Sequence, residues 1–231
     1  IAISSLGVIP TTVSAETELE LHSEAAILLE AETGAVLYAT DNSEVPLPPA
    51  SLTKIMTLLV AMEEFDRGIV DWDTTITASQ KAWETGGSTM FLNINQQTTF
   101  EELIKGIAIV SANDACVAIA EHLYGSEAAF VQKMNQRARE LGMENTNFTN
   151  THGLHDNNHY TSAQDLAILA AYFVKTQPEA AAFQAKPEFT FNEIRQFNRN
   201  PLLGNYPGAD GIKTGNTPQA GFCLASSSEQ N

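Results

Sequence analysis

The sequence predicts an α/β (α+β) fold in which an antiparallel sheet, built from both chain ends, is flanked by helices and carries a helical insertion. Short apolar runs bounded by turn residues lie near both ends of the chain, and longer apolar segments with helical spacing lie between them. The chain has 231 residues, of which 43% are hydrophobic and 17% are charged. That length and composition are typical of a globular domain with a sizeable core.

The N-terminal segment resembles the end of a secretory signal peptide. Residues 1–15 are apolar or small and finish in Val13-Ser14-Ala15, a small-residue pattern that precedes the acidic Glu16. An irregular N-terminal arm is the alternative interpretation. We therefore expect a residual signal peptide over residues 1–15, a single domain over residues 16–231, and a protein that acts outside the cytoplasm.

A hairpin and a buried helix are expected next. Ala25–Glu30 and Ala35–Tyr38 are short apolar runs around a glycine-containing turn, which predicts an antiparallel β-hairpin. The segment Ser51–Arg67 is apolar on most sides, which predicts a helix that is buried nearly all round. Gly68 suits the C-terminal cap of this helix, and the prolines that precede Ala50 suit its start.

Further helices fill the middle of the chain, and strands return towards its C-terminus. Ser126 and Ser162 are suitable N-caps, and Gly125 and Gly142 are suitable helix ends. The expected helices are Phe100–Val110, Ala112–Tyr124, Glu127–Leu141 and a segment from Ser162 to Lys175, and the expected strands are Glu188–Phe191, Gly211–Gly215 and Ala220–Ser226.

The charge balance limits the classes of partner. Twelve Lys and Arg residues against 28 Asp and Glu residues give a formal net charge of −16. This field repels nucleic-acid phosphates and anionic lipid head groups, so neither is an expected partner. A small anionic substrate is still compatible with it, because one buried cation outweighs distant surface charge. No apolar run reaches the length of about 18 residues that a membrane-spanning helix needs.

Ser51 and Lys54 are the first candidate catalytic pair. Their i, i+3 spacing on one predicted helix places the hydroxyl and the amine on the same face, within reach of each other. A serine hydroxyl is a weak nucleophile until a base takes its proton, and a lysine acts as that base only if burial lowers its pKa. Taken alone, the pair also fits a capping serine followed by a lysine that reaches the surface.

Two further motifs follow in the chain. Ser111-Ala112-Asn113 opens a predicted helix, where a second hydroxyl can relay protons and an amide can hold a substrate amide; an ordinary N-cap is the alternative. Lys213-Thr214-Gly215 lies on a predicted strand and offers a cation, a hydroxyl and a residue without a side chain; an edge strand with an exposed lysine is the alternative. Each motif alone is weak evidence for a catalytic site. Their order in the chain and their placement on suitable predicted elements make a chance occurrence of all three a poor explanation.

Together the motifs resemble the S-x-x-K, S-x-N and K-T-G signature of the low-molecular-mass penicillin-binding proteins, which are serine-type D-alanyl-D-alanine carboxypeptidases. This resemblance implies a β-lactamase/transpeptidase-like fold and an enzyme that uses neither a metal nor an organic cofactor. It extends from about Ala25 to Ser227 and is carried by Ala50–Thr57, Ser111–Cys116, His152–Leu154, Asn198–Asn200 and Asp210–Gly215.

The resemblance also implies a role for each matching residue. Ser51 would attack the carbonyl of the penultimate D-alanine of a peptidoglycan stem peptide and release the terminal D-alanine, with Lys54 as the base. Penicillins would mimic this substrate and leave a slowly hydrolysed adduct. Ser111 would relay a proton to the leaving amine, Asn113 would bind the peptide amide, Lys213 and Thr214 would hold the terminal carboxylate beside Gly215, and the backbone N–H groups of Ser51 and Asn216 would form the oxyanion hole.

Three other functions stay open at this point. A class A-like β-lactamase needs a carboxylate that activates the deacylating water, but its Glu-x-x-Leu-Asn motif is absent, and the nearest acid, Glu144, is followed by Asn-Thr-Asn. A peptidoglycan DD-endopeptidase would carry the same motif residues. A wall-binding pseudoenzyme is disfavoured because all three motifs are intact.

The sequence also contains a group of histidines that could form a metal site and two cysteines that could form a disulfide. His152, His155 and His159 fall in one asparagine-rich stretch, a composition that can bind zinc, but a solvated loop without metal is the preferred interpretation. Cys116 and Cys223 lie in apolar surroundings, which favours free thiols without settling whether they pair.

The family pattern continues beyond the strand that carries Cys223. It has a further strand and helix, and often a β-rich stalk domain and an amphipathic membrane anchor, none of which is present in this chain. The expectation is therefore a C-terminally truncated penicillin-binding domain.

Overall fold

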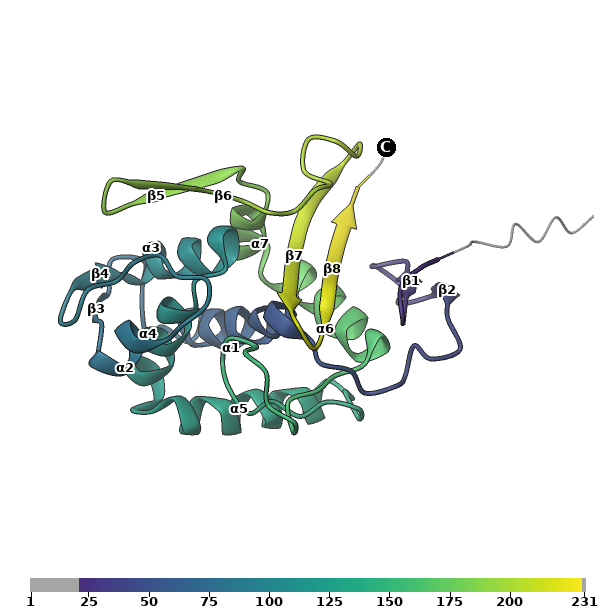
Figure 1. Ribbon diagram of the computed structural model, residues 1–231, viewed down its shortest axis with the longest axis horizontal. Coiled ribbons are helices and arrows are strands. Elements are labelled where there is room, and N and C mark those ends of the chain that lie inside the picture. Colours follow the sequence, from purple (N-terminus) through teal and green to yellow (C-terminus); the bar gives the residue numbers. More distant parts are fainter. Residues whose placement is uncertain (1–20, 230–231) are drawn as a thin grey trace, which may run out of the picture.

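The computed structural model describes residues 21–229, so the expected leader at residues 1–15 lies outside the described part. Helices gather around α1, and antiparallel strand pairs lie around this helical body (Figure 1). The predicted mixture of helices and antiparallel strands is confirmed.

The strands pair two by two. Two of the four pairs come from opposite ends of the described chain, and they form separate sheets, with β1–β2 standing apart from β7–β8 in Figure 1. The antiparallel pairs are β1 (Ile27–Leu29) with β2 (Val36–Ala39), β3 (Thr75–Thr77) with β4 (Gln97–Thr99), β5 (Glu188–Phe191) with β6 (Ile194–Phe197), and β7 (Ala209–Thr217) with β8 (Gly221–Ser228).

Seven α-helices and two short helical turns lie between residues 50 and 184. The turns matter for the site, because each one directly precedes a helix that carries a candidate functional residue. The α-helices are α1 (Lys54–Asp66), α2 (Gln80–Glu84), α3 (Phe100–Lys105), α4 (Asn113–Tyr124), α5 (Glu127–Glu140), α6 (Ala163–Thr176) and α7 (Pro178–Gln184), and the turns are the 3₁₀ turn η1 (Ala50–Thr53) and the π-helical turn η2 (Gly106–Val110).

The helix ends follow local capping chemistry where the sequence predicted it. The Ser126 hydroxyl accepts the backbone N–H of Ala129 at the start of α5, and the Ser162 hydroxyl accepts that of Asp165 at the start of α6. Gly125 ends α4 with a φ of 75°, in the left-handed region that glycine adopts without strain.

The expected continuous helix Phe100–Val110 is wrong in its second half. The α-helix ends at Lys105 and continues as the π-helical turn η2, in which Gly106 O accepts the backbone N–H of Ser111. The apolar pattern is the same in both halves, so periodicity alone cannot distinguish them. The wide turn ends with Ser111 at a φ of 64°, which redirects the chain into α4.

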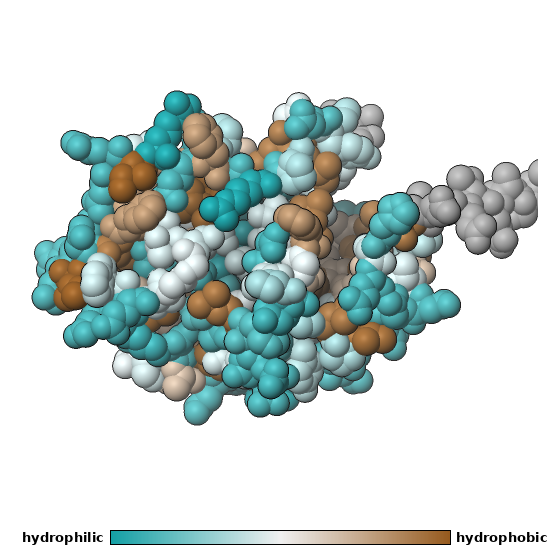
Figure 2. Space-filling model, in the orientation of Figure 1, coloured by the Kyte–Doolittle hydropathy of each residue, from teal (hydrophilic) through white to brown (hydrophobic). Residues whose placement is uncertain are grey.

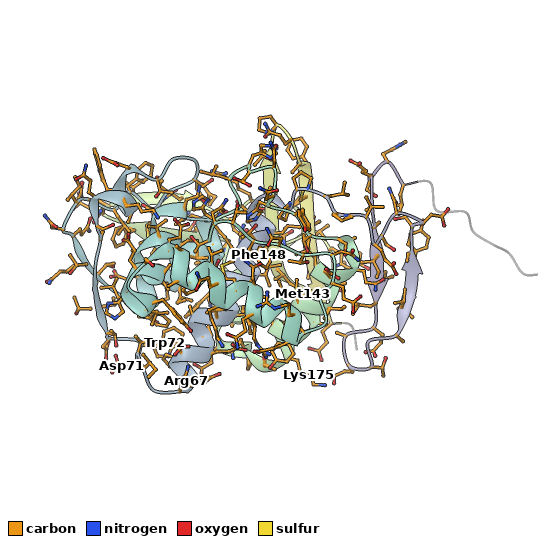
Figure 3. All side chains as sticks on the ribbon, turned by 90° about the horizontal axis from the view of Figure 1, so that it is seen from below. Arg67, Asp71, Trp72, Met143, Phe148 and Lys175 are labelled. Atoms are coloured by element: carbon orange, nitrogen blue, oxygen red, sulfur yellow. The ribbon has the colours of Figure 1, made fainter. Side chains whose placement is uncertain are left out.

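The core surrounds α1, which packs against α4, α5 and α6. At the C-terminal end of α1 the Trp72 ring packs on three phenylalanines, and Trp72 lies next to Arg67 and Asp71 in Figure 3. Beside α5, Phe148 is fully buried (Figure 3), and Asn135 bonds both its backbone N–H and its carbonyl.

The face of the molecule drawn in Figure 2 is mostly hydrophilic. Figure 2 shows brown, hydrophobic side chains as small separate groups among teal ones. Within residues 21–229 no helix is both long and apolar enough to cross a membrane. Cys116 is buried and Cys223 is partly buried, and both thiols are free.

Candidate active site

The 3₁₀ turn η1 and the first turn of α1 bring Ser51 and Lys54 together. In a 3₁₀ turn the residues i and i+3 eclipse one another, so the two side chains leave the helix in the same direction. Lys54 Nζ lies 3.0 Å from Ser51 Oγ and 2.6 Å from the carbonyl oxygen of His152. The Lys54 side chain is fully buried, whereas Ser51 is half-buried and reaches the cleft.

Burial tunes the Lys54 amine towards a base. Loss of water around the ammonium lowers the pKa of Lys54 to about 8, although the nearby Cys116 and Asp114 act in the opposite direction. A neutral amine has two N–H bonds and one lone pair. With one N–H directed at the His152 carbonyl, the lone pair can face the Ser51 hydroxyl.

The Ser111–Asn113 segment presents polar atoms without a protein partner. The backbone N–H of Asn113 donates to Ser88 O, and its Nδ2 donates to Gly86 O, each at 2.7 Å. Ser111 Oγ and Asn113 Oδ1 are buried, and neither has a hydrogen-bond partner in the described part of the chain. Because unpaired buried polar atoms are costly, these two are suited to pairing with a bound ligand.

Strand β7 brings the third motif against η1. A Cβ on Gly215 would lie 3.0 Å from Ser51 N and 3.2 Å from Pro49 O, so only glycine lets the strand approach the nucleophile this closely. Lys213 is 3% exposed and donates to Thr214 O at 2.9 Å. Burial, followed by the charge of Lys54, lowers the pKa of Lys213 to about 7.

The three motifs meet at one cleft of about 230 Å³. Ser51, Asn113 and Asn216 line it, and no acidic residue does. Lys54 and Lys213 are buried and close enough for their charges to interact. The structure therefore places Ser51, Asn113 and Asn216 on the wall of one cleft, with Lys54 and Gly215 against Ser51 and with Lys213 near Lys54. Ser111 and Thr214 lie on the same segments of the chain, at the turn before α4 and on β7, but do not line the cleft.

The 150–159 loop is solvated, as predicted, only in its middle part, residues 154–158. His152 and His159 are buried, and only His155 of the three histidines is exposed. His159 Nε2 lies 2.7 Å from Thr53 Oγ1, and burial lowers the pKa of His159 to about 4. The two ends of the loop are buried because they find hydrogen-bond partners on η1 and α1, which a sequence pattern does not record, whereas residues 154–158 are exposed.

The sequence motifs do not assign a role to Gly153 or Arg199, which also line the cleft. Gly153 has a φ of 88°, and a Cβ there would lie 1.8 Å from Ala50 O, so the loop presses on η1. Across the cleft, Arg199 Nη1 lies 3.2 Å from Ser88 Oγ. Over the described range, no group of three or more His, Cys, Asp or Glu side chains is arranged to hold a metal ion.

Comparison with known proteins gives the family. The model of the Peptidase_S11 family, D-alanyl-D-alanine carboxypeptidase, matches residues 11–231. This chain belongs to that family. The resemblance seen in the three motifs is thereby confirmed, and with it the class of serine hydrolases to which the family belongs.

Several named members of the family are similar over most of this chain. It is 43% identical to the D-alanyl-D-alanine carboxypeptidase DacF of Bacillus subtilis, covering 93% of this chain and 56% of the relative. It is 40% identical to DacA of Haemophilus influenzae, covering 96% of this chain and 55% of the relative. The chain thus spans little more than half the length of these curated relatives.

Several solved structures of similar proteins share the fold. The carboxypeptidase DacD of Francisella tularensis superposes with a TM-score of 0.89 at 31% identity, over 100% of this chain and 67% of the other. Penicillin-binding protein 5 of Haemophilus influenzae superposes with a TM-score of 0.88 at 38% identity, over 97% of this chain and 64% of the other. Penicillin-binding protein D2 of Listeria monocytogenes, solved in a cefotaxime-bound form, superposes with a TM-score of 0.82 at 30% identity, over 92% of this chain and 86% of the other.

Proposed function

We propose that residues 16–231 are the catalytic domain of a serine D-alanyl-D-alanine carboxypeptidase that removes the terminal D-alanine of peptidoglycan stem peptides. One observation carries the proposal: a fully buried lysine amine lies 3.0 Å from the hydroxyl of a serine that opens into a cleft. This is the geometry of a nucleophile paired with its base.

Acylation begins with neutral Lys54. Its lone pair takes the proton of Ser51 Oγ as that oxygen bonds to the carbonyl carbon of the penultimate D-alanine. The backbone N–H groups of Ser51 and Asn216 stabilise the developing oxyanion. When the C–N bond breaks, Ser111 relays a proton from Lys54 to the nitrogen of the departing D-alanine.

The substrate is held by groups that this structure leaves available. Asn113 Oδ1, which has no partner among residues 21–229, accepts the N–H of the stem peptide, and Nδ2 is already held by Gly86 O. Lys213 and Thr214 hold the terminal carboxylate, and Gly215 keeps β7 close to Ser51. A bound carboxylate favours the charged form of Lys213, so substrate binding offsets the effect of burial on this amine.

Deacylation transfers the acyl group from Ser51 to water, which loses one proton as the Ser51 hydroxyl is restored. A class A-like β-lactamase would place a carboxylate beside that water. Glu144, the acid nearest to the expected position in sequence, has an exposed side chain and does not line the cleft. This favours slow hydrolysis of a penicillin adduct, while a DD-endopeptidase stays compatible with the same cleft.

The place of action follows from the substrate. Peptidoglycan lies outside the cytoplasmic membrane, so we infer an extracytoplasmic enzyme, in agreement with the signal-like pattern at residues 1–15. Its partners are then stem peptides and β-lactams.

Time-resolved intact-protein mass spectrometry with benzylpenicillin tests the proposal. We expect a persistent adduct of one penicillin, its absence in Ser51→Ala, and release of D-alanine from an acyl-D-Ala-D-Ala peptide by the wild type only. An adduct that disappears within seconds would instead indicate a β-lactamase. Labelling of Ser51→Ala would refute the assignment of the nucleophile.

A further inference from the structure

A buried carboxylate lies behind the loop segment that contacts Lys54. Glu127 is the first residue of α5, and its side chain is 11% exposed. Its Oε1 accepts the backbone N–H of Thr151 at 3.1 Å and the Thr151 hydroxyl at 2.9 Å. Burial raises the pKa of Glu127, but hydrogen bonds from Lys81 and Thr151 outweigh this effect, so its pKa lies below the usual value and the group is ionised at neutral pH.

The segment that Glu127 holds contacts α1 through two consecutive carbonyl groups. Thr151 O accepts the hydroxyl of Thr57, and His152 O accepts Lys54 Nζ, each at 2.6 Å. Lys54 and Thr57 are three residues apart, so their side chains lie on one face of α1. The position of Thr151 therefore determines where the His152 carbonyl points and, through it, where the Lys54 amine sits.

The imidazole of His152 faces the same carboxylate. Its Nδ1 accepts the backbone N–H of Leu154 at 3.2 Å, so the neutral ring carries its proton on Nε2, which lies 3.6 Å from Glu127 Oε1. Burial lowers the pKa of His152 to about 4, and the ring is neutral at pH 7. Glu127 thus faces both residues of the Thr151–His152 segment.

The remaining carboxylate oxygen makes a more exposed contact. Glu127 Oε2 lies 2.7 Å from Lys81 Nζ, and the Lys81 side chain is 57% exposed. An ion pair with one largely solvated partner contributes little to the free energy of folding. The contacts of Oε1 with Thr151 are the buried ones, so they determine the geometry.

We propose that Glu127 is a positioning residue for the general base: by accepting both hydrogen bonds from Thr151, it directs the His152 carbonyl at Lys54 and keeps the amine within reach of Ser51. This inference rests on the proposed function, in which Lys54 is the base. The important property is that Glu127 accepts hydrogen bonds at this point, and its charge is secondary. A glutamine retains an acceptor oxygen, whereas an alanine does not.

The test measures penicillin acylation over a range of benzylpenicillin concentrations, which separates the dissociation constant K from the acylation rate constant k2. We expect Glu127→Ala to lower k2 by tenfold to a hundredfold with little change in K, because an ångström of misplacement at a base has an effect of this size. Glu127→Gln and Lys81→Met should stay within about threefold of wild type. Glu140→Ala removes an exposed carboxylate from the same helix and serves as the matched control.

The outcomes distinguish failure of the positioning role from failure of the proposed function on which it rests. Absence of labelling in the wild type would overturn the proposed function. A labelling wild type with an equally fast Glu127→Ala would overturn the positioning role, as would a Glu127→Gln as slow as Glu127→Ala at unchanged Tm. If Glu127→Ala does not fold, Thr151→Val decides: it removes one of the two hydrogen bonds, and a k2 equal to that of wild type would overturn the inference.

Discussion

The two buried lysines predict opposite pH dependences for the two stages of acylation. Lys54 must be neutral to take the Ser51 proton, and burial lowers its pKa to about 8, so the active form accumulates as pH rises. Lys213 must be charged to attract a carboxylate, and burial lowers its pKa to about 7, so this form is lost as pH rises. In the free enzyme the two requirements conflict, but in the complex the bound carboxylate keeps Lys213 charged.

The magnitudes follow from these two pKa values, with the lysines treated as independent. Neutral Lys54 amounts to about 10% at pH 7 and about 90% at pH 9, so k2 should rise about tenfold over that interval. The fraction of free enzyme that has a neutral Lys54 and a charged Lys213 is largest midway between the two pKa values, at about pH 7.5. This fraction is about sixfold smaller at pH 6 and at pH 9. We therefore expect a rising curve for k2 and a bell for k2/K.

Stopped-flow or quenched-flow acylation by benzylpenicillin between pH 6 and pH 9.5 measures both quantities. The methyl ester of benzylpenicillin is the control, because it has no carboxylate for Lys213, and its k2/K should lack the descending limb. A k2 that is independent of pH would refute the role of Lys54 as a base with a lowered pKa. A k2/K for benzylpenicillin that still rises at pH 9 would refute the role given to Lys213.

Three glycines give further predictions. Gly153→Ala would place a Cβ 1.8 Å from Ala50 O at a φ of 88°, and we expect a loss of at least about 3 kcal/mol in the free energy of unfolding. Gly125→Ala, at a φ of 75° with open space around it, should lose only about 1 kcal/mol in the same denaturant titration. Gly215→Ala should shift η1 and lower k2 at least tenfold with only a few degrees' loss of Tm; equal k2 values would contradict the close approach to Ser51 N.

The predicted parts of the fold depend on local chemistry. Ser126 and Ser162 mark helix starts because a hydroxyl accepts a backbone N–H three residues away, and Gly125 marks a helix end because it adopts a positive φ. Strands β3 and β4 were not predicted. Each is only three residues long, and they pair across about 20 residues of intervening chain, so no short window of sequence contains the signal.

The candidate site also has one part that the sequence predicts and another part that it does not. The Ser51–Lys54 contact follows from spacing along one turn, so the sequence predicts it. Lys54 also donates to a backbone carbonyl 98 residues away. Because every residue has such a carbonyl, the amino-acid sequence does not indicate which one the lysine contacts. The composition around His152, which bears this carbonyl, indicates a solvated loop or a metal site, whereas in the structure the His152 ring faces Glu127 and its carbonyl contacts Lys54.

Rigid support explains why these distant contacts matter to the chemistry. A lysine side chain has four rotatable carbon–carbon bonds, and burial alone would lower its pKa without fixing its amine. The His152 carbonyl at 2.6 Å restricts the amine, and Glu127 restricts the carbonyl through Thr151. Changes in the loop or at the start of α5 should therefore alter k2 before they alter binding, because they leave the groups that contact the substrate carboxylate in place.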